Sequence, residues 1–365
     1  MSSHPIAIDM TGQHLYAAQL KSVRQGFSIR GLFHRKMEGD AAGDSGAAEA
    51  WVPVFQEIRK ERSFVGRRVV MHLPPPSVFR FPVRVQIGEG ETLEEAILRE
   101  SRQYIPFPLE EAVLDYPSLV SLSTRDGDFS KAMIVAARRE EIQGCTVALE
   151  QAGLILEAVD LGLCSLIRLH RAVCGTGQGA WLLCNIGEET TLLAAVTADS
   201  ILAQRDIPWG MQTLVQKIRS GFGIKGPEPS AESILQEYGF LYEDRDRWKD
   251  AAAAAPDSRA ENACRAIYQI LSPCTDELVH ELHKIIGYVR SEESNAALEC
   301  VYLYGHAGLI RSLDHHLEKR LSLATQLVNP LSALVLSEKS VPADRFQAAP
   351  FGLALGLAMR KVSWL

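Results

Sequence analysis

The chain has 365 residues, of which 47% are hydrophobic and 23% are charged, and its formal net charge is -7 at neutral pH. This composition is typical of a globular protein with room for two or more hydrophobic cores, and it excludes a largely disordered chain. The negative charge argues against broad electrostatic binding to nucleic acid or to an anionic bilayer. We therefore expect no nucleic-acid partner.

The cysteines and the apolar segments indicate a cytoplasmic protein. The chain has seven cysteines and no C-x-x-C pair, and most of the seven lie in apolar contexts. This pattern favours reduced, buried thiols over a disulfide framework. The first ten residues lack the pattern of a signal peptide, and no apolar run reaches the length that spans a bilayer, so we expect no direct membrane insertion.

The first elements in chain order are two apolar strands that a short glycine turn joins, residues 6–20, with a third strand-like run at 26–35. The same arrangement recurs at 182–196 and 200–208. A unit that recurs half a chain later indicates a duplication. We therefore predict two related lobes, each built on a three-stranded meander.

Between the two meanders the pattern predicts an insertion. Apolar residues at helical spacing predict a helix over 47–61, a strand follows at 68–73, and the triple proline 74–76 is a plausible domain boundary. Beyond it the expected elements of the insertion are a strand at 78–85, a helix at 91–103, strands at 112–119 and 130–137, a helix at 139–152 and a strand at 154–160.

After the insertion the chain returns to the lobes. Residues 161–173 have helical spacing, and a glycine-rich linker, 175–179, leads to the second meander. Residues 209–298 are predicted to be mostly helical, with a surface loop at 243–256. The last expected elements are a strand at 300–304, a glycine turn at 305–308, a helix ending near 321, a short strand at 325–328 and a helix at 349–361.

The three glycine turns together are more specific than any one of them. The first follows an acid at position 9, the second follows Asn185, which aligns with it, and the third begins at Gly305. In this order they resemble the phosphate-1, phosphate-2 and adenosine motifs of the actin-like ATPase fold. The resemblance predicts an α/β protein with the actin-like ATPase fold: two related lobes, each a three-stranded meander plus helices, and an α+β inserted subdomain of the FtsA type.

One family within this fold is similar in detail. The segment YIPFPLEEAVLDY, which ends at Tyr116, resembles the signature of PilM, the type IV pilus assembly protein related to the cell-division protein FtsA. So do QRDIP at 204–208, Asn329-Pro330 and the closing GLALGLA at 352–358. The resemblance implies a first lobe of residues 1–76, 161–178 and 345–365, an inserted subdomain of residues 77–160, and a second lobe of residues 179–344 that includes a helical part at 212–298.

The resemblance also implies a nucleotide site between the lobes, with ATP and Mg²⁺ as its ligands and no structural metal. The residues that it assigns to nucleotide binding are Asp9, Thr11, Gly12, Gln13, Asn185, Gly187, Glu188, Thr190, Thr191, Gly210, Glu232, Gly305, His306 and Gly308. Glu188 and Glu189 fit the second turn if their side chains point away from its anion-binding N–H groups, as we expect.

This sequence departs from the family at several of these positions. Asn185 replaces the acid that orients Mg²⁺ or water, and an amide carries no charge to hold a cation. Other family residues are replaced by Thr11 (glycine), Tyr16 (lysine), Trp209 (glycine), His306 (glycine) and Leu235 or Gln236 (lysine). We expect the Trp209 indole to crowd the site. Transfer of a phosphoryl group depends on such charges, so we expect no hydrolysis, and ATP binding is left open.

The family's partner is the N-terminal tail of an inner-membrane protein, PilN, held in a groove between the first lobe and the insertion. Our candidates for this surface are Tyr104, Ile105, Phe107 and Leu109, because an apolar cluster next to prolines is a rigid, preformed surface. A role in the core of the insertion is the alternative. The last residues, 362–365, directly follow the final helix, so we expect attachment to the membrane through a partner.

The chain has two pairs of closely spaced histidines whose roles have to be predicted. His280 and His283 are three residues apart on one predicted helix face, but no third ligand is evident, so we do not predict a metal site. For His315 and His316 we predict a solvated helix surface.

The sequence as a whole favours a non-enzymatic cytoplasmic adaptor of pilus assembly that also binds other pilus assembly proteins. The alternatives are an active ATPase or sugar-kinase-like phosphotransferase, or a secretion-system or cell-division relative of the same fold.

Overall fold

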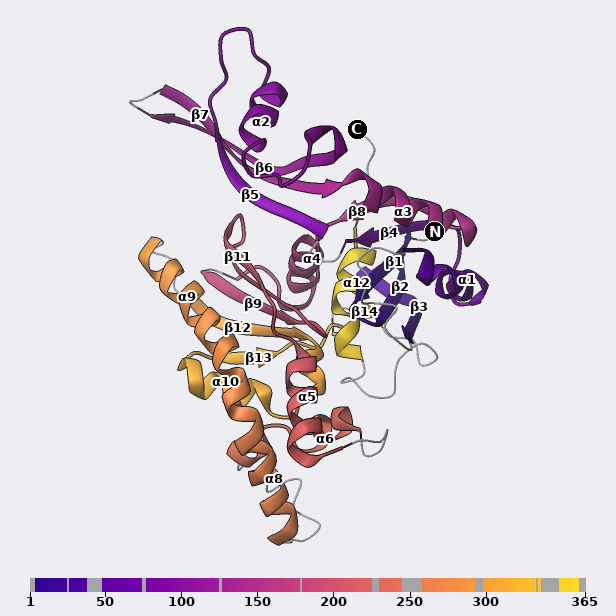
Figure 1. The fold of residues 1–365 in the computed structure, drawn as a ribbon, viewed down its shortest axis with the longest axis vertical. Helices are drawn as coiled ribbons and strands as arrows, with labels where there is room; N and C mark the ends of the chain where they lie inside the picture. The colour runs from indigo at the N-terminus through magenta and orange to yellow at the C-terminus, as the bar shows by residue number, and fades with distance from the viewer. Residues whose placement is uncertain are drawn as a thin grey trace. The chain divides into compact units, whose positions relative to one another are not determined.

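The protein forms two compact units, which we describe separately (Figure 1). Unit 1 comprises Met1–Lys36, Arg62–Gly66 and Asp160–Leu365, and unit 2 comprises Met37–Glu61 and Arg67–Val159. The computed structural model describes residues 4–24, 26–37, 48–73, 77–124, 127–177, 179–224, 230–244, 258–292, 298–332, 334–335 and 348–360.

Unit 1 contains both meanders and most of the helices. Its strands are β1 (Ile6–Thr11), β2 (His14–Val23), β3 (Gly26–Lys36), β9 (Ala180–Ile186), β10 (Thr191–Val196), β11 (Ile201–Ile207), β12 (Leu298–Gly305), β13 (Thr325–Leu327) and β14 (Leu334–Val335). Its helices are α4 (Gly162–Cys174), α5 (Met211–Phe222), α6 (Ala231–Glu237), α8 (Ser258–Leu271), α9 (Asp276–Glu292), α10 (Leu313–Leu321) and α12 (Gly352–Ala358), with short 3-10 turns η5 (Leu241–Glu243), η7 (Ser272–Thr275), η8 (His306–Leu309) and η9 (Ala349–Phe351).

The first meander consists of β1, β2 and β3 in antiparallel pairing, and β14 adds to β3 in parallel. In the β1–β2 register Asp9 lies opposite Tyr16 and Thr11 lies opposite His14. The turn between these strands is Gly12-Gln13, and Gly12 has a φ of +54°, which glycine adopts at little cost. This confirms the first predicted meander.

The second meander is the centre of a five-stranded sheet with the strand order β11-β10-β9-β12-β13. All residues of β9 and β10 are buried, which explains their continuous apolar sequence. Helix α9 packs on this sheet, and the apolar side chains of α5 and α9 share one core with it. The second predicted meander is therefore confirmed, with β12 added beside it as a parallel strand.

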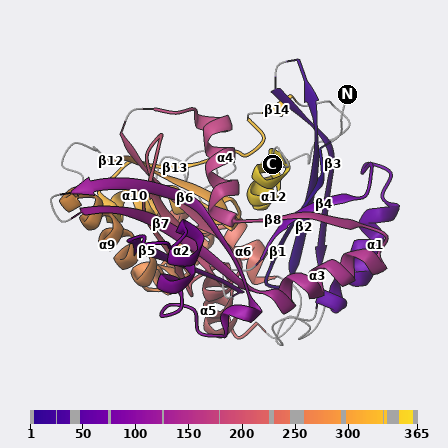
Figure 2. The ribbon, with the colours of Figure 1, turned by 90° about the horizontal axis from the view of Figure 1, so that it is seen from above.

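Helices α4 and α12 lie beside each other in unit 1, as both views show (Figures 1 and 2). Helix α12 also contacts β1 and β2. The sequence predicts one helix over 349–361, but the structure has the 3-10 turn η9 followed by α12, which ends at Ala358. The prediction was too long at both ends, because residues 349–351 form a 3-10 turn and the α-helix ends before Met359.

Unit 2 contains the elements expected between the meanders. They are η2 (Ala48–Trp51), α1 (Val52–Lys60), β4 (Arg68–His72), β5 (Val78–Val85), α2 (Leu93–Ser101), η4 (Leu109–Glu111), β6 (Ala112–Thr124), β7 (Gly127–Arg138), α3 (Arg139–Gln151) and β8 (Ile155–Asp160), whose last residue, Asp160, belongs to unit 1. Strands β5, β7 and β6 form an antiparallel sheet in that order, and α2 packs against β5.

The predicted elements agree with the observed ones at most positions. The exceptions are small: the two-residue strand β14 was not predicted, and β6 and β7 are longer than expected. The triple proline 74–76, most of the predicted loop 243–256 and residues 362–365 lie outside the described residues. The division into two lobes and an insertion stays a prediction.

Candidate functional site

The β1–β2 turn and the β9–β10 turn meet through the side chain of Glu188. The Gln13 backbone N–H donates a hydrogen bond of 2.9 Å to Glu188 Oε2, and the Gln212 side-chain amide donates one of 3.0 Å to Oε1. His14 Nε2 lies 3.5 Å from Oε1. Glu188 is 1% exposed, so this carboxylate joins the first meander to the second sheet and to α5 from a buried position.

Glu188 is ionised in this position. Burial alone raises the pKa of a carboxyl, but the contact with His14 and the hydrogen bonds from Gln13 and Gln212 outweigh it and lower the pKa of Glu188 to about 2. A buried carboxylate with this many donors is a compensated charge. We expected the side chains of Glu188 and Glu189 to point away from the N–H groups of the β9–β10 turn. Glu189 is exposed, and the Glu188 carboxylate accepts from the Gln13 N–H of the β1–β2 turn.

A row of aromatic and imidazole rings adjoins this carboxylate. His14 Nδ1 lies 2.7 Å from Nε2 of His34, and the two rings are stacked. The Tyr16 hydroxyl lies 3.2 Å from Nε2 of His306. Burial, with the negative charges of Asp9 and Glu188, raises the pKa of Tyr16, so the side chain in the family's lysine position is neutral.

The third predicted turn contributes Gly305 and His306. Gly305 has a φ of +67°, and a Cβ there would lie 2.4 Å from the Ile186 carbonyl oxygen, so only glycine fits. His306 is 2% exposed, and burial, reinforced by His14, lowers its pKa to about 4. Beside them Asn185 Oδ1 is buried without a hydrogen-bond partner among the described residues.

Buried His306 should make the protein sensitive to acid. A folded-state pKa of about 4 lies below the unfolded value of about 6.5, so the unfolded chain binds the extra proton between these values and stability falls as pH falls from 6.5 to 4. The loss is on the order of 3 kcal/mol. We expect His306→Gln to remove this part of the pH dependence in urea unfolding series. The control His280→Gln changes an exposed histidine and should keep the slope; equal slopes for both variants would contradict the assignment.

The other predicted residues of the first two turns also come together. Gly187 N–H donates to the Thr190 carbonyl at 2.9 Å, and Thr191 Oγ1 donates to the Trp209 carbonyl at 2.7 Å. A Cβ on Gly187 would lie 3.4 Å from Thr11 Oγ1, and one on Gly210 would lie 2.4 Å from the Glu188 carbonyl oxygen. The residues that the structure gathers at the two turns are Asp9, Thr11, Gly12, Gln13, Asn185, Gly187, Glu188, Thr190, Thr191 and Gly210.

Glu232, Gly308 and Trp209 lie outside the β1–β2 and β9–β10 turns. Glu232 lies on α6, and its carboxylate is 3.9 Å from Lys36 Nζ and 3.7 Å from an Arg219 guanidinium nitrogen. Gly308 is buried within η8. The Trp209 indole does not crowd the turns as we expected: it is 1% exposed, packs in the core of the second sheet and donates to the Cys274 carbonyl at 2.7 Å.

Sequence reasoning missed His14, His34 and Gln212. No motif assigns a role to any of the three. His14 and Gln212 contact Glu188, and His34 contacts His14, because the fold brings these parts of the chain together. The available signal was Glu188 itself. An acid two residues after a fully buried strand needs donors from elsewhere in the chain if it is buried too.

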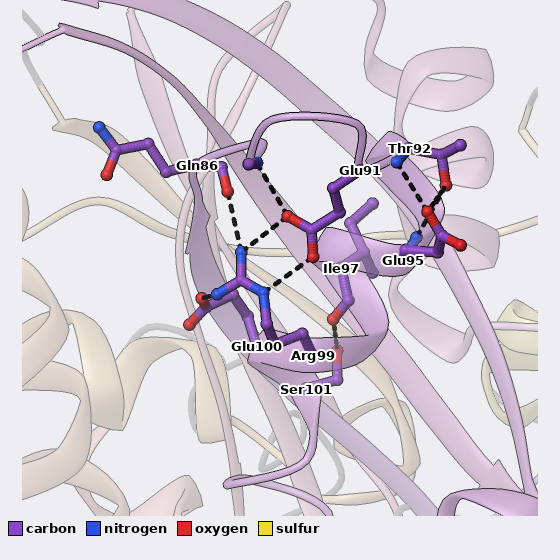
Figure 3. Close-up of polar contacts among 9 residues, drawn as sticks. Gln86, Glu91, Thr92, Glu95, Ile97, Arg99, Glu100 and Ser101 are labelled. Atoms are coloured by element: carbon purple, nitrogen blue, oxygen red, sulfur yellow. Dashed lines mark hydrogen bonds and ion pairs between the residues drawn. The ribbon is translucent and has the colours of Figure 1, made fainter.

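The candidate partner residues lie in unit 2, after α2. The start of α2 is fixed by a capping box between Thr92 and Glu95, and Arg99 on the same helix donates to Glu91 and to the Gln86 carbonyl (Figure 3). These contacts hold the helix that leads into the segment.

Within that segment the candidates divide into two groups. Ile105 and Phe107 are buried in the core of unit 2, and Leu109 packs against this core. Tyr104 is 48% exposed, and its ring stacks on Phe81 with 5.0 Å between centroids. Tyr104 is thus the candidate that presents a large surface, while its neighbours hold the segment in place.

A comparison with protein families identifies the chain. The model of the type IV pilus assembly protein PilM matches residues 7–245 and 226–362. The chain belongs to the PilM family.

Solved structures of similar shape bear on the fold. A chain of a PilM-PilN type IV pilus biogenesis complex is 24% identical, with a TM-score of 0.75 over 97% of each chain. The ethanolamine utilization protein EutJ from Carboxydothermus hydrogenoformans is 13% identical, with a TM-score of 0.54 over 98% of this chain and 90% of that one. The predicted actin-like ATPase fold is confirmed.

The histidine pairs of this PilM family member have different surroundings. His280 and His283 are exposed on α9, and the described residues contain no group of three or more His, Cys, Asp or Glu that could hold a metal ion. His316 is fully buried between Thr275, at 2.9 Å, and Glu243, at 2.6 Å. The prediction of a solvated surface was therefore wrong for His316, whose partners come from distant parts of the chain.

The residues of the two turns do not fit the phosphates of ATP in this arrangement. The N–H group that would bind an anion is used by Glu188, and Glu188 Oε2 lies only 2.3 Å from where a Cβ on Gly12 would be. Tyr16 supplies no positive charge. ATP binding stays a prediction from the resemblance.

Among the described helices none is long and apolar enough to cross a membrane.

Proposed function

We propose that this PilM family member is a cytoplasmic adaptor of type IV pilus assembly without enzymatic activity. It binds the N-terminal tail of a PilN-like protein of the inner membrane and links it to other pilus assembly proteins. Through that partner it is peripheral to the membrane.

The observation that carries the proposal is the family match over nearly the whole chain. The structure with the TM-score of 0.75 belongs to a complex of PilM with PilN, which supports a PilN-like partner here. The replaced residues at the two turns support a role that does not depend on hydrolysis. Asn185 and Tyr16 stand where a metal-orienting acid and a phosphate-binding lysine would be needed, and neither carries the required charge.

Tyr104 is our candidate anchor for the peptide. Aromatic side chains dominate binding where a rigid base holds them. The base here is Phe81 below the ring, with Ile105 and Phe107 buried on the C-terminal side of Tyr104. The four residues that we assign to partner binding are Tyr104, Ile105, Phe107 and Leu109; in this proposal Tyr104 contacts the peptide and the other three position it.

We expect Tyr104→Ala to weaken the binding of the partner's N-terminal peptide by roughly tenfold, as for truncation of an aromatic anchor. Titration calorimetry with synthetic peptides from the neighbouring pilus membrane proteins measures this. The matched control is Tyr288→Ala, because Tyr288 is 49% exposed on α9 and should leave the affinity unchanged. If no such peptide binds the wild-type protein, the adaptor proposal fails; if both variants bind like wild type, the assignment of Tyr104 fails.

The retained turn residues favour a second candidate, an actin-fold ATPase or phosphotransferase. Asp9 is buried at the end of β1, and Gly187 and Gly305 keep the backbone of the two other turns. Phosphate release from Mg-ATP that is lost in Asp9→Ala would support this candidate. Its absence at millimolar nucleotide would exclude it.

A further inference from the structure

The β1–β2 turn has the features of an anion site. Gly12 has a left-handed backbone, and the next residue, Gln13, directs its N–H at an anion. The imidazole of His14 and the amide of Gln212 both contact the second oxygen of the same anion. The anion that they contact is the carboxylate of Glu188.

We propose that Glu188 is an internal anion that takes the place of a nucleotide phosphate at this turn, so that the first meander and the second sheet are joined without nucleotide. This goes beyond the adaptor proposal, and it can fail while the adaptor proposal stands.

Space supports the proposal. A Cβ added to Gly12 would meet three atoms of the Glu188 side chain within 3.3 Å, so the carboxylate lies directly on the glycine. Glu188 itself cannot easily withdraw, because its backbone is fixed by the hydrogen bond from Gln212 N–H to its carbonyl, at 2.8 Å, and by the close approach of Gly210.

Charge supports it as well. The negative charges of Asp9 and Glu188 both raise the pKa of Tyr16, so two acids already lie near the turn. A phosphate would add further negative charge to a place where the residue in the lysine position is a neutral tyrosine. Like charges at this range disfavour one another strongly in a buried site.

The test is rescue by an added anion. In Glu188→Ala the donors from Gln13, His14 and Gln212 lose their acceptor, and we expect the melting temperature to fall by on the order of 10 °C. Millimolar acetate or inorganic phosphate should then raise it by roughly 2–5 °C relative to sodium chloride of equal ionic strength. Wild type and the control Glu189→Ala, in which an exposed neighbour is changed, should show no such shift with either anion or with Mg-ATP.

Two results would overturn the proposal. One is a stabilisation of the wild-type protein by Mg-ATP, because a carboxylate that occupies the turn excludes the phosphate. The other is a folded Glu188→Ala that neither acetate nor phosphate stabilises. If Glu188→Ala does not fold, Glu188→Gln decides: it keeps the side-chain size but not the charge, so a melting temperature equal to that of wild type refutes the proposal and a lower one supports it.

Discussion

Gly356→Ala should lower the free energy of unfolding by about 3 kcal/mol, whereas Gly352→Ala, one turn earlier in the same helix, should be neutral or slightly stabilising. A Cβ on Gly356 would lie 2.0 Å from the Ser165 carbonyl oxygen and 2.7 Å from its carbonyl carbon. Both atoms are backbone of α4, which cannot rotate aside, so the helices must separate. A Cβ on Gly352 meets only the tip of Leu169, at an ordinary 3.5 Å.

Urea unfolding of the two variants measures the difference, and their pairing removes helix propensity as an explanation. In a helix interior alanine is the better helix former by about 1 kcal/mol, so propensity favours Gly356→Ala and cannot explain a loss of stability there. The steric explanation would be contradicted if Gly356→Ala unfolded at the same urea concentration as Gly352→Ala. It would also be contradicted if Gly356→Ser, which adds one further atom, were more stable than Gly356→Ala.

The closing GLALGLA segment shows what could and could not be predicted from the sequence. The sequence predicted a helix over 349–361, but the spacing of small residues did not say which glycine contacts a neighbour. The structure supplies the reason: Gly356 faces the backbone of α4, whereas Gly352 does not approach it closely. Strands and helices were predictable because their apolar period is local, and the two meanders were predictable because they repeat.

The candidate site was predictable only in its backbone. The turns at Gly12 and Gly187 follow from local glycine chemistry, and both lie where they were expected. The orientation of Glu188 does not, because its donor Gln13 is 175 positions away in the chain. His316 is a second example, since its partner Glu243 is 73 positions away. Contacts of this kind leave no period or motif in the sequence.

Trp209→Gly, which restores the family's glycine pair, should destabilise the protein by about 3–5 kcal/mol and should not create nucleotide binding. The indole is buried in the core of the second sheet, so its removal leaves a cavity there and deprives the Cys274 carbonyl of a donor. It opens nothing at the β1–β2 turn, because Glu188 still accepts from Gln13. Trp209→Phe is the matched control: it keeps most of the ring volume, loses the hydrogen bond and should cost about 1–2 kcal/mol.

Urea unfolding and a thermal shift series with Mg-ATP check both halves of this prediction. A large loss of stability without a nucleotide shift means that Trp209 is part of the core, so that placing glycine there does not create a nucleotide site. A Trp209→Gly variant that is as stable as wild type, or that Mg-ATP stabilises, would mean instead that the indole blocks the site. The two explanations differ in where the ring lies, and its 2.7 Å hydrogen bond to Cys274 places it in the core.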